Sequence, residues 1–474
     1  MYLSLLFGSA VHAQTKYLLI DGGASKSSNY SRYYNSVLTG YEVLKGKGKQ
    51  VSVIAKDGKW TMASLDEVSS GQQANIQSGK LVYPAISSPA RDLNDIRKAL
   101  SSYKDGDTLY LHFTSHGGGP SKPGHPESST LSLFGNDVSY EDLAGVLKEF
   151  PNLKFKIYSG VCYGGGIHHL ARSLKNVCSS SAVPYFTQSY SGSPQMNVFE
   201  FEFWKSIKSN NRPSLASASL DSFEKDIANI DLGSLSSFDY VDFVLKKGPY
   251  GKTYDELPSV RVNANSIPRD PKDPPLWAEG MLKIAQPNGY RSISSTVKTT
   301  AQIVDCNTGS CCASTAISND ITRLKRLSET LNEVVQQSAI QDLRTKAERQ
   351  PAEVRTIFHN VIDDMKKNGQ KYLQISNQYQ QKYKELVGRW NAHKEKFKDS
   401  WGITKWWYGE GEERAKIQKE FDVLKANAQR DLKQYSFDHQ MLERLDRLDE
   451  FNKKATPKQK EKFVQLLQCE WEPI

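Results

Sequence analysis

The sequence predicts an α/β domain with a mainly parallel sheet flanked by helices, followed by an all-α helical C-terminal domain. Apolar, strand-like runs alternate with helix-like segments from Lys16 to about Val198, which is typical of strand–helix–strand units. Four prolines within residues 266–275 block regular structure and indicate a boundary. Beyond about Asn319 the chain becomes charged and helix-forming, with apolar residues at three- and four-residue steps.

The predicted strands of the α/β domain are short apolar runs. Five are expected, at residues 17–20, 51–54, 109–113, 155–158 and 183–186. Helix-like segments at 92–103, 140–150 and 167–174 separate the later runs and serve as crossovers. Because parallel sheets bind ligands at the carboxyl ends of their strands, we expect the functional site in the loops that follow the third and fourth runs.

The 474 residues exceed what one hydrophobic core usually supports, so we expect more than one domain. The predicted segments are a signal peptide with a truncated start (1–13), the α/β domain (14–265), a Pro-rich linker (266–305) and the helical domain (306–474). Apolar residues recur at helical spacing in residues 324–334 and 379–390, which predicts an amphipathic bundle or hairpin.

The first 13 residues resemble a secretory signal. A short apolar core of leucines and Phe7 precedes Val11-His12-Ala13, which places small residues before a cut ahead of Gln14. The alternative is a disordered or buried N-terminal strand. No later run approaches the ~20 apolar residues that span a bilayer, so we expect no membrane span and an extracytoplasmic (periplasmic or secreted) protein.

Composition and motifs exclude several function classes. The formal charge of +9 is modest for this length and no dense Lys/Arg block occurs, so nucleic-acid binding is not indicated. The sequence has no Cys-x-x-Cys, His-Glu-x-x-His, P-loop or Gly-x-Ser-x-Gly pattern. We therefore expect neither a metal nor a cofactor.

The six cysteines support an oxidising compartment. If Cys162 is a reactive thiol, we expect Cys306, Cys311 and Cys312 to reach Cys469 and close two disulfides within the helical domain. A bond between the adjacent Cys311 and Cys312 is the least expected pairing. Cys178 is then left free and buried.

Two glycine-rich strings carry the chemistry, 114–119 (Thr-Ser-His-Gly-Gly-Gly) and 159–166 (Ser-Gly-Val-Cys-Tyr-Gly-Gly-Gly). They place His116 and Cys162 46 positions apart (162 − 116), each just after a predicted strand. Taken alone, the cysteine could be inert and buried, and the histidine could be a loop residue without a role. Together they predict a cysteine nucleophile with an imidazole partner. His112, His168 and His169 are weaker candidates.

These residues resemble the caspase-like cysteine peptidases, the clan of caspases, legumains, gingipains and separases. The segment 111–117 (Leu-His-Phe-Thr-Ser-His-Gly) is most similar to the legumain, or asparaginyl endopeptidase, pattern, and the spacing of His116 and Cys162 is compatible with the clan. The segment 29–32 (Asn-Tyr-Ser-Arg) resembles the legumain Asn-Tyr-Arg motif with one extra residue. The resemblance covers about residues 16–210 and implies a caspase-like sheet.

The resemblance also implies roles for individual residues. Cys162 is the nucleophile and His116 the acid and base, while the amides of Gly117 and Cys162 form the oxyanion hole. Asn29 orients the histidine, and Arg32 lines the pocket for the residue before the scissile bond.

One position departs from the legumain pattern. Gly160 stands where legumains have a glutamate, two residues before the nucleophile, so asparagine or arginine specificity does not carry over. Asp21, just past the first strand, is a candidate replacement. Ser189 and Tyr190, after the fifth run, lie where clan members pair with the substrate backbone.

The sequence thus predicts a secreted or periplasmic cysteine endopeptidase that acts on peptide or protein substrates through a Cys–His dyad and an acyl-enzyme. Legumains carry a helical prodomain over the active site, which suggests a zymogen cut between residues 266 and 306 and inhibition by the helical domain. The alternative is a catalytically inactive caspase-like scaffold whose helical arm docks partners.

Overall fold

The computed structural model describes residues 15–22, 31–54, 93–122, 125–133, 136–185, 189, 198–226, 234–247, 337–397 and 410–474. Two compact units make up the chain. The first consists of Met1–Ser222, Leu232–Tyr240 and Glu461–Ile474, and the second of Phe223–Asp231 and Val241–Lys460. The predicted helical domain ran to the end of the chain, whereas here the C-terminal segment, Glu461–Ile474, groups with the first unit.

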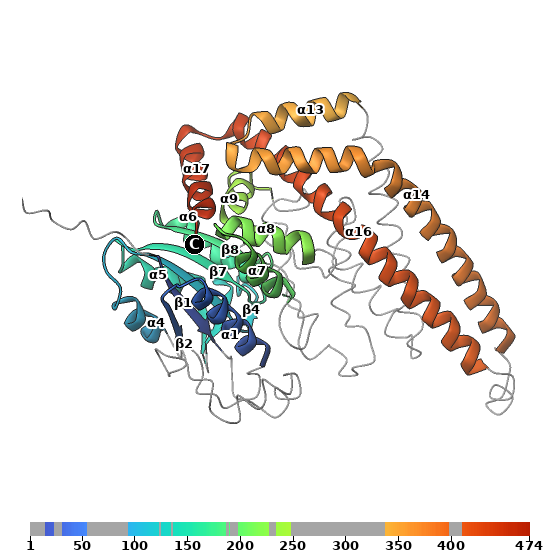
Figure 1. The fold of residues 1–474 in the computed structure, drawn as a ribbon, viewed down its shortest axis with the longest axis horizontal. Helices are drawn as coiled ribbons and strands as arrows, with labels where there is room; N and C mark the ends of the chain where they lie inside the picture. Colours follow the sequence, from blue (N-terminus) through green and yellow to red (C-terminus); the bar gives the residue numbers. More distant parts are fainter. Residues whose placement is uncertain are drawn as a thin grey trace, which may run out of the picture. The chain divides into compact units, whose positions relative to one another are not determined.

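The first unit is built on a six-stranded sheet with the order β2-β1-β3-β7-β8-β9, in which only β9 is antiparallel to its neighbour (Figure 1). This confirms the predicted mainly parallel sheet. The four predicted strands at 17–20, 51–54, 109–113 and 155–158 are present. The strands are β1 (Thr15–Asp21), β2 (Val51–Ile54), β3 (Thr108–Thr114), β7 (Lys154–Ser159), β8 (Val177–Ser181) and β9 (Ser234–Leu235).

Helices flank this sheet as predicted. Helix α1 packs on β1 and β2 and beside α7, whereas α5 lies beside both α4 and α6. These helices leave the central strands mostly buried, which explains the continuous apolar runs 17–20 in β1 and 109–111 in β3. The helices are α1 (Ser31–Gly46), α4 (Leu93–Leu100), α5 (Tyr140–Lys148), α6 (His168–Ser173), α7 (Val198–Ser209), α8 (Leu215–Asp226) and α9 (Ser236–Leu245).

A small antiparallel sheet, which the sequence did not predict, follows the histidine loop. Its strands are β4 (Gly117–Gly118), β5 (Thr130–Leu133) and β6 (Asn136–Ser139). Two glycines carry no strand signal, and the other two segments are only four residues long, so no alternating pattern could develop.

The fifth strand was predicted at the wrong place. It spans Val177–Ser181 rather than residues 183–186. Four of the five residues of β8 are Cys or Ser, yet all five are buried. The buried ring of His168 forms hydrogen bonds with two of the serine hydroxyls, one at each ring nitrogen. Its Nδ1 lies 2.9 Å from Ser179 Oγ and its Nε2 lies 3.2 Å from Ser181 Oγ. The hydroxyls are therefore satisfied without water, which an apolar pattern cannot reveal.

The predicted disulfide pairing is also wrong. Cys178, expected to be free, is bonded to Cys469, 291 positions away. Cys178 lies in β8 and Cys469 in α17 (Pro457–Trp471), two elements that only the tertiary fold brings together. Cys306, Cys311 and Cys312 lie outside the described residues.

Further contacts hold the C-terminal segment to the first unit. Buried Lys156 of β7 donates from Nζ to the carbonyl oxygens of Glu472 at 2.8 Å and Pro473 at 3.1 Å. The amide of Ile474 donates to the carbonyl of Pro213 at 2.8 Å. The last residues are therefore an integral part of the α/β unit.

The second unit is helical, as predicted. Two long helices, α14 (Ala352–Phe397) and α16 (Glu410–Lys454), run side by side (Figure 1). A shorter helix, α13 (Gln337–Glu348), packs against both of them. The predicted apolar stripe at 379–390 packs between the long helices, where Leu386 and Trp390 join Ile417 and Leu424 in a buried cluster. The predicted stripe at 324–334 lies outside the described residues.

Candidate active site

The two glycine-rich strings lie at the carboxyl ends of neighbouring strands. Strands β3 and β7 are parallel and adjacent, with Phe113 in register with Ser159. His116 follows β3 and Cys162 follows β7 within three residues of the strand ends. The neighbouring β1 and β3 are the strands between which the sheet order changes direction, where α/β sheets bind their ligands.

Gly117 brings the two loops into direct contact. A Cβ built on Gly117 would lie 2.1 Å from the carbonyl oxygen of Cys162 and 2.8 Å from a methyl group of Val161. Such an approach is possible only without a side chain. The backbone after His116 therefore lies against the backbone of Cys162, as two halves of one site require.

Cys162 has the environment of an accessible thiol. It is half-buried, it is free of disulfides, and its Sγ lies 3.8 Å from the carbonyl oxygen of Ser189. The next residue, Tyr163, has φ 58° and ψ 22°, the left-handed region that non-glycine residues rarely adopt. Tyr163 is the N-cap of the short 3₁₀ helix η2 (Gly164–Ile167), so the chain turns directly after Cys162. A non-glycine residue held in the left-handed conformation costs about 1–3 kcal/mol of conformational free energy, and such residues cluster at active sites.

The ring of His116 packs against an aromatic ring of α1. The Tyr33 ring meets it edge-on, with centroids 5.3 Å apart and planes at 76°. Tyr33 is buried, so it limits the orientations open to the imidazole. Sequence reasoning missed Tyr33, although it directly follows the Asn-Tyr-Ser-Arg segment.

Of four other predicted site residues, the structure describes the surroundings of Asp21 but not those of the other three. Asp21 ends β1, in register with Thr114, and is fully buried. Arg32 lies in the first turn of α1, and its side chain is outside the described residues. Asn29 and Tyr190 also lie outside the described residues, so their roles stay predictions.

Gly160 is faced by a carboxylate that sequence reasoning missed. A Cβ on Gly160 would lie 2.2 Å from Oε1 of Glu200, a buried residue of α7. The same oxygen lies 3.2 Å from Nε2 of His112, and the other lies 3.3 Å from Oγ1 of Thr114. No motif marks Glu200, because it lies on a helix 40 positions after Gly160 (200 − 160).

His112 is a buried structural histidine. Its ring stacks on Tyr158, with centroids 4.5 Å apart, and lies 4.6 Å from the Trp204 ring. Burial lowers the pKa of His112 to about 3, so the imidazole is neutral at physiological pH.

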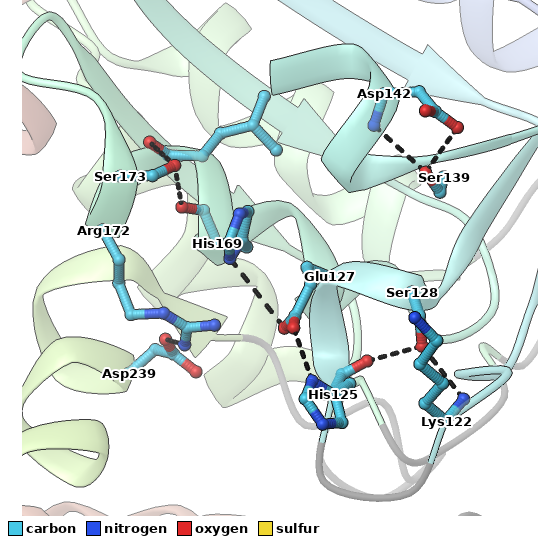
Figure 2. A network of polar contacts seen from close by, with 11 residues as sticks. Lys122, His125, Glu127, Ser128, Ser139, Asp142, His169, Arg172, Ser173 and Asp239 are labelled. Carbon is cyan, nitrogen blue, oxygen red and sulfur yellow. Dashed lines mark hydrogen bonds and ion pairs between the residues drawn. The ribbon is translucent and has the colours of Figure 1, made fainter. Parts of the chain in front are cut away.

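A polar network braces the helix that follows the Cys162 turn. In Figure 2, Glu127 lies between two imidazoles, with His125 Nδ1 at 2.8 Å and His169 Nδ1 at 3.9 Å. Although burial opposes ionisation, hydrogen bonds from the Glu127 amide and His125 and the charge of His169 lower the pKa of Glu127. Glu127 thus ties the 3₁₀ turn η1 (Pro126–Ser128) to α6.

Within the described residues, no group of three or more His, Cys, Asp or Glu side chains is arranged to hold a metal ion. Nor does that part of the chain contain a helix long and apolar enough to cross a membrane.

No protein-family model matches the chain, and no curated protein matches it significantly. Among solved structures, it is similar to the crystal structure of protein GSU0716 from Geobacter sulfurreducens, with 13% sequence identity and a TM-score of 0.30. The match covers 45% of this chain and 89% of that one. At this level the similarity does not bear on function.

Proposed function

We propose that the protein is a caspase-like, legumain-like cysteine endopeptidase in which Cys162 is the nucleophile and His116 the acid and base. The observation that carries the proposal is the contact of Gly117 with the Cys162 carbonyl. It joins a histidine loop and a cysteine loop from adjacent strands, and this supports the proposal that backbone amides of both loops serve one reacting centre.

In the proposed reaction, the Cys162 thiolate attacks the peptide carbonyl carbon and forms the C–S bond. The developing oxyanion accepts hydrogen bonds from the amides of Gly117 and Cys162. The C–N bond then breaks as His116 protonates the leaving amine, and water hydrolyses the acyl-enzyme. General acid–base catalysis of this kind contributes about 10²–10⁴-fold, and one oxyanion donor about 10²–10³-fold.

The Cys178–Cys469 disulfide supports the further proposal that the protein works outside the cytoplasm, because structural disulfides persist mainly in oxidising compartments. On the basis of the proposed reaction, we also propose a peptide or protein substrate.

We also propose that the protein is a zymogen, and that its cleaved form consists of two fragments that remain linked by a disulfide. A cut between residues 266 and 306 separates Cys178 from Cys469 along the chain, but the disulfide still joins the two fragments. Self-processing should therefore give two bands on a reducing gel and one band on a non-reducing gel, and Cys162→Ala should stay uncut.

A thiol-reactive peptide electrophile tests the enzyme against the inactive scaffold. We expect selective labelling of Cys162, detected by mass spectrometry, together with cleavage of a peptide library. Both should be lost in His116→Ala and kept in His359→Ala, which removes an imidazole of helix α14 in the second unit. Labelling and cleavage that survive His116→Ala would refute the dyad, and absence of both in the wild type would favour the scaffold.

A further inference from the structure

The side-chain position of Gly160 is occupied by the carboxylate of another residue. A Cβ at Gly160 would lie 2.2 Å from Oε1, 2.6 Å from Cδ and 3.1 Å from Cγ of Glu200. Real side chains do not approach so closely, so Glu200 in this position requires glycine at 160. The end of β7 therefore has a carboxylate beside it, supplied by α7 instead of by the strand itself.

Two donors from β3 hold this carboxylate. His112 Nε2 lies 3.2 Å from Oε1, and Thr114 Oγ1 donates to Oε2 at 3.3 Å. The other ring nitrogen of His112, Nδ1, lies 3.2 Å from the hydroxyl of Tyr110. A neutral His112 thus donates through Nε2 and accepts at Nδ1, which leaves it one orientation among its packed aromatic neighbours.

The Glu200 carboxylate lies beside the segments that lead to both predicted catalytic residues. Thr114 is two residues before His116, and Gly160 is two residues before Cys162. The Glu200 side chain is 2% exposed, so it is closed off from solvent and from a substrate. Its contacts are instead with the strand ends that deliver the two predicted catalytic groups.

We propose that Glu200 is a positioning residue, which fixes the Cys162 loop relative to the His116 loop by contacting Gly160 and bonding His112 and Thr114. This inference rests on the proposed peptidase function. A buried hydrogen-bond network whose members are all paired holds its groups in one arrangement, and a displacement of about 1 Å between reacting groups can cost about 100-fold in rate.

The first test compares Glu200→Ala with Glu202→Ala, a matched change on the same helix whose carboxylate pairs with the exposed Lys205. We expect Glu200→Ala to lower kcat about 100-fold and to change KM little, because the substrate does not contact Glu200. Glu202→Ala should keep both constants. Wild-type kcat in Glu200→Ala overturns the proposal.

The second test separates the carboxylate from its volume. In Glu200→Ala, the added change Gly160→Glu returns a carboxylate to the same space, and Gly160→Met fills that space without charge. We expect the glutamate double variant to recover at least about tenfold of the lost kcat and the methionine double variant to recover none. Equal recovery in both, or recovery in neither, overturns the positioning role.

A third measurement keeps this inference separate from the proposed function. The rate at which iodoacetamide alkylates Cys162, followed against pH, reports the thiolate fraction without any peptide cleavage. If the wild type cleaves no peptide and His116→Ala leaves this profile unchanged, the peptidase proposal fails. If Glu200→Ala also leaves the profile and the plateau rate unchanged, the inference about Glu200 fails independently.

Discussion

Glu470 should make the stability of the α/β unit depend on pH. Its carboxylate is fully buried and accepts from Ser236 Oγ at 2.6 Å, Ser237 Oγ at 2.6 Å and the Ser237 amide at 2.8 Å. Burial outweighs these hydrogen bonds and raises the pKa of Glu470 to about 7, against 4.5 for an ordinary glutamate. The folded state therefore binds this proton more tightly than the unfolded state does.

The sign and size of the effect follow from linkage. Between the unfolded and folded pKa values, the folded protein carries a proton that the unfolded chain has lost, so stability falls as pH rises from about 4.5 to about 7. The difference between a pKa of about 7 in the folded state and 4.5 in the unfolded chain corresponds to about 3 kcal/mol. Glu470→Gln, which cannot ionise, should lack this loss.

Urea unfolding at pH 4.5, 6 and 8, with the disulfide intact, measures the effect. The free energy of unfolding of Glu470→Gln relative to wild type should rise by about 3 kcal/mol across this range. Glu461→Gln, an exposed change on the same helix, should follow the wild type at every pH. Parallel curves for Glu470→Gln and wild type would show that burial does not hold the proton, and would refute the reasoning.

Four other changes have expected outcomes. Replacing Cys178 and Cys469 with serine should lower the free energy of unfolding by about 2–5 kcal/mol, measured by urea titration. Gly117→Ala should abolish peptide cleavage and Cys162 labelling, because its Cβ cannot lie 2.1 Å from the Cys162 carbonyl oxygen; full activity would place the two loops apart. Cys162→Ala should remove all turnover, and residual cleavage at the wild-type rate would exclude the thiol mechanism. Trp390→Ala should cost about 3–5 kcal/mol in the helical unit, seen as a loss of helical circular dichroism on heating at a lower temperature.

The parts of the fold that the sequence predicts are those where local pattern and burial coincide. Strands β1 and β3 were predicted because each contains a run of contiguous, buried apolar residues, and β2 and β7 because most residues of their predicted runs, 51–54 and 155–158, are apolar or aromatic. Strand β8 was missed because its buried hydroxyls are satisfied by His168 and Ser219, whose positions depend on tertiary contacts. The site was predicted only in part, for the same reason. Gly117 and Cys162 lie beside strand ends, whereas the Glu200 carboxylate reaches Gly160 from a distant helix.

The C-terminal segment changes what a zymogen of this chain could be. The chain leaves the first unit after Tyr240 and returns to it at Glu461, so the long helices are inserted within the α/β unit and do not follow it. The disulfide from Cys178 to Cys469 and the hydrogen bonds of Lys156 hold the returning segment to β8 and β7. One cut between residues 266 and 306 therefore cannot release the helices, because their C-terminal end still continues into Glu461–Ile474, which stays bound to the first unit. Activation by release needs two cuts, and activation by one cut needs a rearrangement with all fragments retained.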